Sequence, residues 1–171
     1  NKLGIVARLL PVAGAFHSVL VASAQSALIP EVANVKMQSP RIPVYANSTA
    51  LPYDLDVDVI RGQLSKQLLN PVQFMSQINA MYADGARIFV ELGPKNILTN
   101  LVGQILANKE HTAVSLDGQG GGMRGLLSAL GILIKCGVDM QLSALFAGRG
   151  VQQIDLTNLV ASTSKPINPP T

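Results

Sequence analysis

His17 is the residue in this sequence best placed to carry acid–base chemistry. It lies near the end of the stretch LLPVAGAFHS (residues 9–18), where an apolar run gives way to a Gly-Ala-Phe bend and then to Ser18, a residue that can begin a helix. An imidazole can act as the base for a serine or cysteine nucleophile. A lone histidine at a strand end can equally be a hydrogen-bonded structural residue, because one imidazole specifies no reaction.

The other residues with ligand or redox chemistry form no comparable site. His111 follows a charged turn, so we expect a solvated loop residue rather than a ligand. The single Cys136 excludes an internal disulfide, and with two histidines it leaves too few soft ligands for a structural zinc site. These counts favour a reducing, cytoplasmic setting and no bound metal. The carboxylates of DLDVD (residues 54–58) lack the glycine and glutamate of a calcium loop, so they predict a helix start.

The tract GGGMRG (residues 120–125) matches the pattern G-x-G-x-x-G of a nucleotide-binding turn. It follows a predicted strand, precedes a predicted helix, and is followed by Asp139 about 20 residues later. A tract this rich in glycine matches the pattern easily, and dinucleotide sites normally use the first strand–helix turn of their unit. We therefore favour an ordinary loop and keep an NAD-binding protein as a weaker alternative.

Composition bounds the class of protein. With 171 residues, 48% of them hydrophobic, the chain is long and apolar enough for one folded domain. Its net charge of +3 comes with no cluster of Lys or Arg, so we expect no nucleic-acid partner. No apolar run approaches the roughly 18 residues of a membrane span, and Arg8 interrupts the apolar N-terminal stretch that otherwise resembles a signal peptide. We therefore expect a soluble protein without a membrane partner.

Hydrophobic periodicity predicts strands that alternate with helices. A strand over 4–12 is followed by a helix that Pro30 should end or kink, and an amphipathic helix falls within 56–69. Asn70 and Pro71 are typical of the start of a further helix, which Gly85 should stop. The remaining predicted elements are strands at 42–47, 87–92 and 112–116 and helices at 97–106 and 124–135. This order predicts an α/β fold with a mainly parallel sheet.

Four segments together resemble one known family. LLPVAGAFHS, IPVYANSTALPY, QLLNPVQF and GARIFVELGPKNILTNLV, in this order and spacing, resemble the C-terminal half of the malonyl-CoA:acyl carrier protein acyltransferase family, as found in polyketide and polyunsaturated fatty acid synthases. The most specific string is FVELGPKNIL. The resemblance implies that residues 1–13 are the last strand of a small ferredoxin-like subdomain, that residues 14–146 belong to an α/β-hydrolase-like large subdomain, and that residues 147–171 form a linker or disordered tail.

The resemblance also implies roles for four residues. In the family, the serine of a GHSxG motif attacks the malonyl thioester and a histidine is its base; His17 matches that histidine, and Gln67 matches the position whose backbone carbonyl orients it. Phe16 matches a substrate-binding position where phenylalanine accompanies malonyl rather than methylmalonyl. Gly14 replaces the first histidine of the common HAFH pattern, and GAFH is compatible with the polyunsaturated fatty acid synthase branch.

The implied substrates are a CoA thioester and a phosphopantetheinyl acyl carrier protein, with no tightly bound cofactor. The sequence contains no G-x-S-x-G motif. We therefore expect the nucleophile to lie upstream of residue 1, the upstream half of the acyltransferase and neighbouring synthase domains to be partners, and this chain alone to be inactive. The alternative is a noncatalytic module that docks a carrier protein or braces neighbouring domains.

Overall fold

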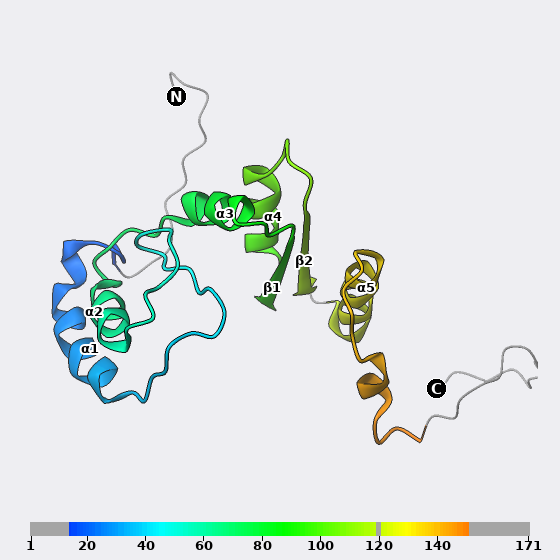
Figure 1. The fold of residues 1–171 in the computed structure, drawn as a ribbon, viewed down its shortest axis with the longest axis horizontal. Coiled ribbons are helices and arrows are strands. Elements are labelled where there is room, and N and C mark those ends of the chain that lie inside the picture. The colour runs from blue at the N-terminus through cyan, green and yellow to red at the C-terminus, as the bar shows by residue number, and fades with distance from the viewer. Residues whose placement is uncertain (1–13, 119–120, 151–171) are drawn as a thin grey trace, which may run out of the picture. The chain divides into compact units, whose positions relative to one another are not determined.

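The computed structural model describes residues 14–118 and 121–150. Figure 1 shows three helices in succession, after which strands and helices alternate over residues 88–135. The predicted strand over 4–12 lies outside the described residues, as does the end of the tail from residue 151 onward. The chain divides into two compact units, with the boundary between Ile132 and Leu133. The α-helices and β-strands in chain order are α1 (Ala22–Asn34), α2 (Val57–Lys66), α3 (Phe74–Ala83), β1 (Ile88–Pro94), α4 (Ile97–Ile105), β2 (Thr112–Asp117) and α5 (Gly122–Lys135), and short 3-10 helices cover Val19–Val21 and Leu142–Phe146.

A parallel pair of strands, β1 and β2, confirms the predicted α/β architecture. The pairing runs from Ile88 opposite Thr112 to Glu91 opposite Ser115, and the register then shifts before Pro94 meets Asp117. Helix α4 connects the two strands, as a parallel pair requires a crossover. The carboxyl ends of both strands therefore lie at the same edge, where α4 begins.

The core of this region lies between α3, α4 and the two strands. Ile78, Val102 and Leu106 form its buried centre, and Leu106 is fully buried. The predicted helix at 97–106 is present as α4, although the apolar residues of its sequence are only partly buried. Ile97 and Leu98, at the first turn of α4, are 59% and 46% exposed, because the stripe packed against α3 and the strands is narrower than the apolar stripe in the sequence.

Gly85 ends α3 as predicted. Its φ of 101° lies in the left-handed region that favours glycine. The N–H of Gly85 donates to the carbonyl of Tyr82 at 3.1 Å, and the N–H of Ala86 donates to the carbonyl of Met81 at 2.9 Å. These two bonds form a Schellman motif, which satisfies carbonyls that have no partner within the helix.

The predicted start of α3 at Asn70 and Pro71 is wrong, because the helix begins at Phe74. The N–H of Asn70 donates to the carbonyl of Lys66 at 3.3 Å, so Asn70 completes the turn that follows α2. Gln73 then donates its N–H to the carbonyl of Asn47 at 2.7 Å. The segment between the two helices is thus held by contacts that a local capping pattern does not reveal.

Pro30 does not end α1, which continues to Asn34. A proline inside a helix removes one N–H donor and crowds the preceding turn, yet it does not by itself stop the chain from continuing. The carbonyls of Val32 and Ala33 after Pro30 accept hydrogen bonds from Arg61 of α2. A side chain from a different helix therefore stabilises the last turn.

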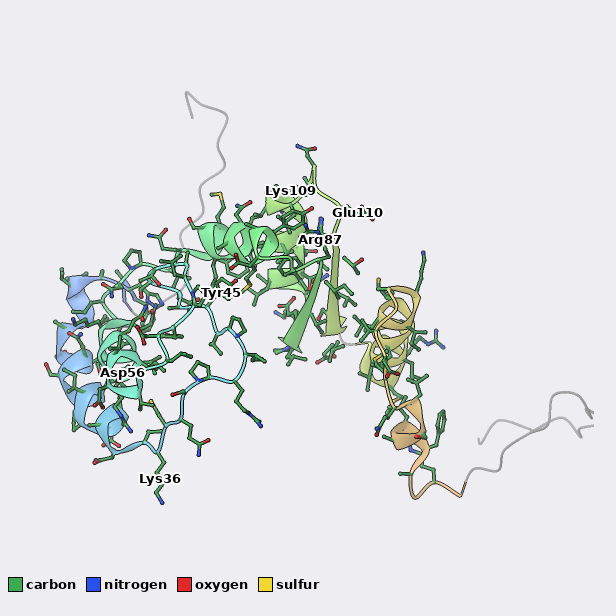
Figure 2. The ribbon with its side chains drawn as sticks, in the orientation of Figure 1. Lys36, Tyr45, Asp56, Arg87, Lys109 and Glu110 are labelled. Atoms are coloured by element: carbon green, nitrogen blue, oxygen red, sulfur yellow. The ribbon has the colours of Figure 1, made fainter. Side chains whose placement is uncertain are left out.

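The predicted strand over 42–47 is reduced to one isolated antiparallel bridge between Tyr45 and Pro52. Proline has no N–H to extend a ladder, and Pro43 and Pro52 both lie in this region. The segment is instead anchored to α3, because Gln77 donates a side-chain bond to the carbonyl of Tyr45 at 2.9 Å and the Tyr45 hydroxyl donates to Asp84. The hydrogen bond to Asp84 is the main cause of the raised pKa of Tyr45, a residue labelled in Figure 2.

The predicted amphipathic helix within 56–69 is confirmed as α2. The carboxylate of Asp56 accepts the N–H of Asp58 at 2.8 Å and caps the helix, so the carboxylates of residues 54–58 begin a helix as expected. Within the described ranges, none of the helices is both long enough and apolar enough to cross a bilayer.

Candidate active site

The structure brings His17 and Gln67 together although 50 residues separate them in sequence. The imidazole Nδ1 of His17 lies 3.1 Å from the backbone oxygen of Gln67. Because a carbonyl oxygen only accepts, this contact is a hydrogen bond only when Nδ1 carries the proton. In that tautomer Nε2 keeps its lone pair, and a neutral imidazole with a free Nε2 can take a proton from a nucleophile.

His17 occupies a tight bend in the chain. Its φ of 59° is left-handed, a region where histidine is enriched among non-glycine residues. The N–H of Phe16 donates to the carbonyl of Gly14 at 3.1 Å, and the Ser18 hydroxyl donates to the carbonyl of Ala15 at 2.6 Å. Local hydrogen bonds therefore hold the bend that exposes the imidazole.

Helices α1 and α2 lie side by side and set the distance between His17 and Gln67 (Figure 1). A short 3-10 turn and then α1 follow His17, whereas Gln67 comes directly after α2. Near this end of the pair, the side chain of Gln25 donates to the carbonyl of Ser65 at 2.9 Å. The bond joins the first half of α1 to the last turn of α2, the turn that presents the Gln67 carbonyl.

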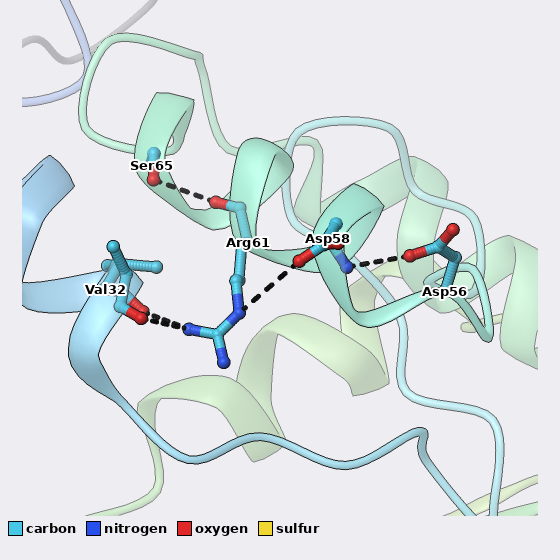
Figure 3. Close-up of polar contacts among 6 residues, drawn as sticks. Val32, Asp56, Asp58, Arg61 and Ser65 are labelled. Atoms are coloured by element: carbon cyan, nitrogen blue, oxygen red, sulfur yellow. Dashed lines mark hydrogen bonds and ion pairs between the residues drawn. The ribbon is translucent and has the colours of Figure 1, made fainter.

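Arg61 fastens the other end of the same helix pair (Figure 3). Its Nη1 donates to the carbonyl of Val32 at 2.7 Å and to that of Ala33 at 2.8 Å. A cation there also complements the negative end of the α1 dipole. The ion pair with Asp58 is long, at 3.9 Å, and the Asp58 side chain is 95% exposed, so that pair adds little. Arg61 acts mainly by joining the last turn of α1 to α2.

Phe16 and Gly14 lie in the His17 bend, and both are exposed. Phe16 is 61% exposed, and the next apolar residues, Val19 and Leu20, are 79% and 77% exposed. A cavity of about 330 Å³ elsewhere in this unit is lined by α3, β1 and α4 and includes none of the four residues that the sequence singles out. The bend thus presents an imidazole within an apolar surface.

The carboxamide of Gln67 behaves differently from its backbone. Both polar side-chain atoms, Nε2 and Oε1, are buried and make no hydrogen bond. Leaving such a group unpaired costs about 1–3 kcal/mol. The structure shows a polar group without a partner next to the His17 contact.

Sequence reasoning missed Glu91, which caps α4 from strand β1. Its carboxylate accepts the N–H of Leu98 at 3.1 Å, the N–H of Thr99 at 2.8 Å and the Thr99 hydroxyl at 2.7 Å. Asn96, at the usual cap position, makes no side-chain cap bond. Burial pushes the pKa of Glu91 up, but these hydrogen bonds outweigh burial and hold it below its ordinary value of 4.5. The available signal was a glutamate inside an otherwise apolar strand that leads directly into a helix.

The turn after Glu91 is fixed to the neighbouring strand. Lys95 has a left-handed φ of 71°, and its N–H donates to the carbonyl of Asp117 at 3.0 Å. Its own carbonyl accepts a hydrogen bond from the Ser115 hydroxyl. The segment FVELGPKNIL therefore links the carboxyl ends of β1 and β2 to the start of α4 through these hydrogen bonds.

Two cations flank Tyr82 near the opposite ends of the strands. Arg87, directly before β1, lies 3.9 Å from the Tyr82 ring centroid, and Lys109, before β2, lies 5.0 Å from it (Figure 2). His111 is in the adjoining loop, with its Nδ1 2.8 Å from the carbonyl of Lys109.

Residues 14–118 and 121–150 contain no group of three or more His, Cys, Asp or Glu arranged to hold a metal ion.

The described part of the glycine tract has a packing explanation. A Cβ on Gly121 would lie 3.0 Å from the Gly125 Cα, tighter than ordinary contacts of a Cβ with a backbone. Gly125 donates its N–H to the carbonyl of Gly121 at 3.0 Å in the first turn of α5. Residue 120, the first of the nucleotide-binding pattern, lies outside the described ranges. The close approach favours the ordinary-loop interpretation.

Several characterised proteins are similar to this chain, although no protein-family model matches it. The polyketide biosynthesis protein ThaF of Burkholderia thailandensis is 39% identical over 100 residues, 58% of this chain and 8% of ThaF. The malonyl CoA-acyl carrier protein transacylase of Escherichia coli K12 is 34% identical over 97 residues, 57% of this chain and 31% of that enzyme. A polyunsaturated fatty acid synthase polypeptide of a Thraustochytrium species is 32% identical over 103 residues, 58% of this chain and 4% of that polypeptide.

The fold is also found in a solved structure. The acyltransferase domain from the second module of the salinomycin polyketide synthase superposes with a TM-score of 0.72 and 25% identity, over 85% of this chain and 35% of that domain chain. This chain spans at most about a third of the length of the curated relatives that it matches.

Proposed function

Because this chain belongs to the malonyl-CoA:acyl carrier protein acyltransferase family, we propose that it forms the C-terminal part of an acyl-transferring domain. The reaction moves a malonyl group from CoA to the phosphopantetheine thiol of an acyl carrier protein. The name of the similar Escherichia coli enzyme, a malonyl CoA-acyl carrier protein transacylase, supports both substrates. The residues of this chain require no tightly bound cofactor for such a transfer.

The observation that carries the proposal is the contact between His17 Nδ1 and the Gln67 carbonyl at 3.1 Å. It leaves Nε2 of His17 free to remove the proton from a serine hydroxyl as the oxygen attacks the thioester carbonyl. The bond to sulfur then breaks, and the imidazolium returns its proton to the departing CoA thiolate. Serine is left as a malonyl ester, and His17 is again neutral.

The second half-reaction reverses the roles. Nε2 of His17 takes the proton from the phosphopantetheine thiol, whose sulfur attacks the malonyl ester. The serine oxygen leaves and recovers the proton from the imidazolium. Throughout, the Gln67 carbonyl holds the Nδ1 proton, stabilises the charged ring and keeps its orientation, which is the role an acidic partner plays in a triad.

The nucleophile comes from residues outside this chain, since the sequence contains no G-x-S-x-G motif. The exposed apolar surface of Phe16, Val19 and Leu20 supports a docked partner region at the same place. That partner is the remainder of the acyltransferase, and neighbouring synthase domains adjoin it. Without the serine, this chain alone does not turn over.

Phe16 and Gly14 shape the space for the acyl group. The Phe16 ring is free of neighbours over most of its surface, so it can line a pocket completed by the rest of the domain. A ring in this position disfavours a methyl branch on the substrate, an effect worth about 1–3 kcal/mol for one methyl group. Malonyl is therefore the proposed substrate, ahead of methylmalonyl.

A second candidate is a noncatalytic module that docks a carrier protein or braces neighbouring domains. The missing nucleophile motif favours it. The two candidates differ in the sequence that precedes this chain in its parent protein. A GHSxG motif about 110 residues before His17 supports the enzyme, and its absence supports the module.

The decisive experiment measures malonyl loading by the complete domain. His17→Ala should abolish formation of the acyl-enzyme and transfer to the carrier protein. His111→Ala is the matched control, because the imidazole of that histidine lies 2.8 Å from the Lys109 carbonyl in its own loop, away from the contact between His17 and Gln67. Undiminished acyl-enzyme formation and transfer in His17→Ala would contradict the proposed role of the imidazole.

A further inference from the structure

The unpaired carboxamide of Gln67 requires an explanation that the His17 contact does not supply. His17 uses only the backbone carbonyl of Gln67, whereas Nε2 and Oε1 of the side chain are buried without a partner. Buried polar groups in native proteins are nearly always hydrogen-bonded, and an unpaired one points to a missing partner or to a functional role. Gln67 as a whole is only partly buried, whereas its two polar side-chain atoms are covered, so pairing with a group outside this chain requires a change of side-chain rotamer.

We propose that the Gln67 carboxamide is a positioning group that binds main-chain polar groups of the segment carrying the nucleophilic serine. This inference rests on the proposed function. A carboxamide both donates and accepts hydrogen bonds, as a peptide group does, so one glutamine side chain can pair with a neighbouring main chain twice. Pairing removes the cost of the unpaired amide and attaches the serine segment to the residue that holds the base.

The geometry of His17 brings that segment within range. A hydroxyl that passes its proton to Nε2 lies about 2.6–3.2 Å from it, and Nδ1 on the other side of the ring lies 3.1 Å from the Gln67 oxygen. The serine oxygen is therefore on the order of 8 Å from the Gln67 backbone. An extended glutamine side chain covers most of this span, so its carboxamide reaches the main chain beside the nucleophile.

The surface around the pair is suited to receive such a segment. Val19 and Leu20 are apolar and more than three-quarters exposed, a large exposed area for residues beside a candidate site. A segment that covers them also shields a carboxamide that extends toward it from water, which strengthens the hydrogen bonds between them. Docking of the segment, pairing of Gln67 and alignment of His17 then occur as one event.

The test is Gln67→Met in the complete acyltransferase domain. Methionine keeps an unbranched chain of similar length and leaves intact the backbone carbonyl that binds His17. We expect a Tm lower by about 2–4 °C, because polar groups of the serine segment lose their partner. We also expect kcat for malonyl loading to fall about tenfold with KM unchanged, because misalignment of base and nucleophile acts on the reacting geometry.

Gln63→Met, in the last part of α2 just before Gln67, is the matched control. The Gln63 side chain donates to the Thr49 hydroxyl at 3.2 Å within this chain, so its loss should lower Tm and leave the loading rate within about twofold of wild type. If the Gln67 carboxamide stays unpaired in the complete domain, Gln67→Met removes a buried unpaired group, and a Tm equal to or above wild type overturns the proposal.

A lower Tm with unchanged kcat would show a paired carboxamide that positions nothing, and it overturns the positioning role. Failure of the proposed function is recognised separately, because the wild-type domain would then load no malonyl. In that case the sign of the Tm change in Gln67→Met still decides whether the carboxamide has a partner outside this chain.

Discussion

Arg61 of α2 closes the last turn of α1 by donating one Nη1 group to the Val32 carbonyl at 2.7 Å. The same nitrogen lies 2.8 Å from the Ala33 carbonyl, so one guanidinium binds two carbonyls of the last turn of α1. Together with the bond from Gln25 to the Ser65 carbonyl, it fixes α1 against α2 at two points. The approach of His17 to Gln67 depends on this fixed pair of helices.

Arg61→Met should destabilise the complete domain by about 2–3 kcal/mol, because it keeps the aliphatic stem and removes hydrogen bonds from a charged group. Urea unfolding measures the change. Asp58→Asn is the control and should cost under about 1 kcal/mol, since its ion pair is long and exposed. Equal effects of the two variants would mean that the ion pair, rather than the carbonyl contacts, joins the helices.

Glu91→Gln should flatten the loss of stability in acid. The pKa of Glu91 is lowered in the folded protein, so its carboxylate stabilises the fold above the pKa of the unfolded chain. That stabilisation is lost as the pH falls below 4.5 and through the folded pKa. Unfolding free energies between pH 7 and acid should fall less steeply for the variant than for wild type.

Glu110→Gln provides the control for this pH series. It removes the same charge from the loop before β2 and leaves the Glu91 cap of α4 unchanged. Its profile should run parallel to that of wild type over the acid range. An equal flattening in Glu110→Gln would assign the effect to net charge instead of the cap.

Gly85→Ala and Gly62→Ala should change stability in opposite directions. Gly85 has a φ of 101° at the end of α3, so an added Cβ is strained there, and the variant should lose about 1–2 kcal/mol. Gly62 lies inside α2 with no atom near an added Cβ, so alanine should gain about 0.5–1 kcal/mol. Thermal unfolding of both variants checks the pair, and a gain for Gly85→Ala would contradict the role of its conformation.

Much of this fold follows from local patterns. The strands, α2 and the Gly85 stop were predicted because hydrophobic period, acidic first turns and glycine act within a few residues. The failures have a different origin. The end of α1 depends on Arg61, 29 residues from Val32, and the loop before α3 depends on the carbonyl of Asn47. A pattern that covers one turn does not contain such contacts.

The residues of the candidate site were likewise predictable from the sequence only in part. His17 stands out in the sequence because its residue type and its place after a bend are both visible there. Its partner Gln67 followed from family resemblance, since no spacing rule joins a histidine to a backbone oxygen 50 residues away. Glu91 was overlooked because a strand residue caps a helix that begins six residues later.

The left-handed backbone at His17 also bears on how its variants are interpreted. Alanine removes the imidazole, and it is also disfavoured at a φ of 59°, so the bend itself is free to relax. Asparagine tolerates that conformation and provides no group of imidazole basicity. A comparison of the two substitutions separates the loss of the imidazole base from the loss of the left-handed backbone conformation. His17→Asn is therefore the variant that tests the base alone.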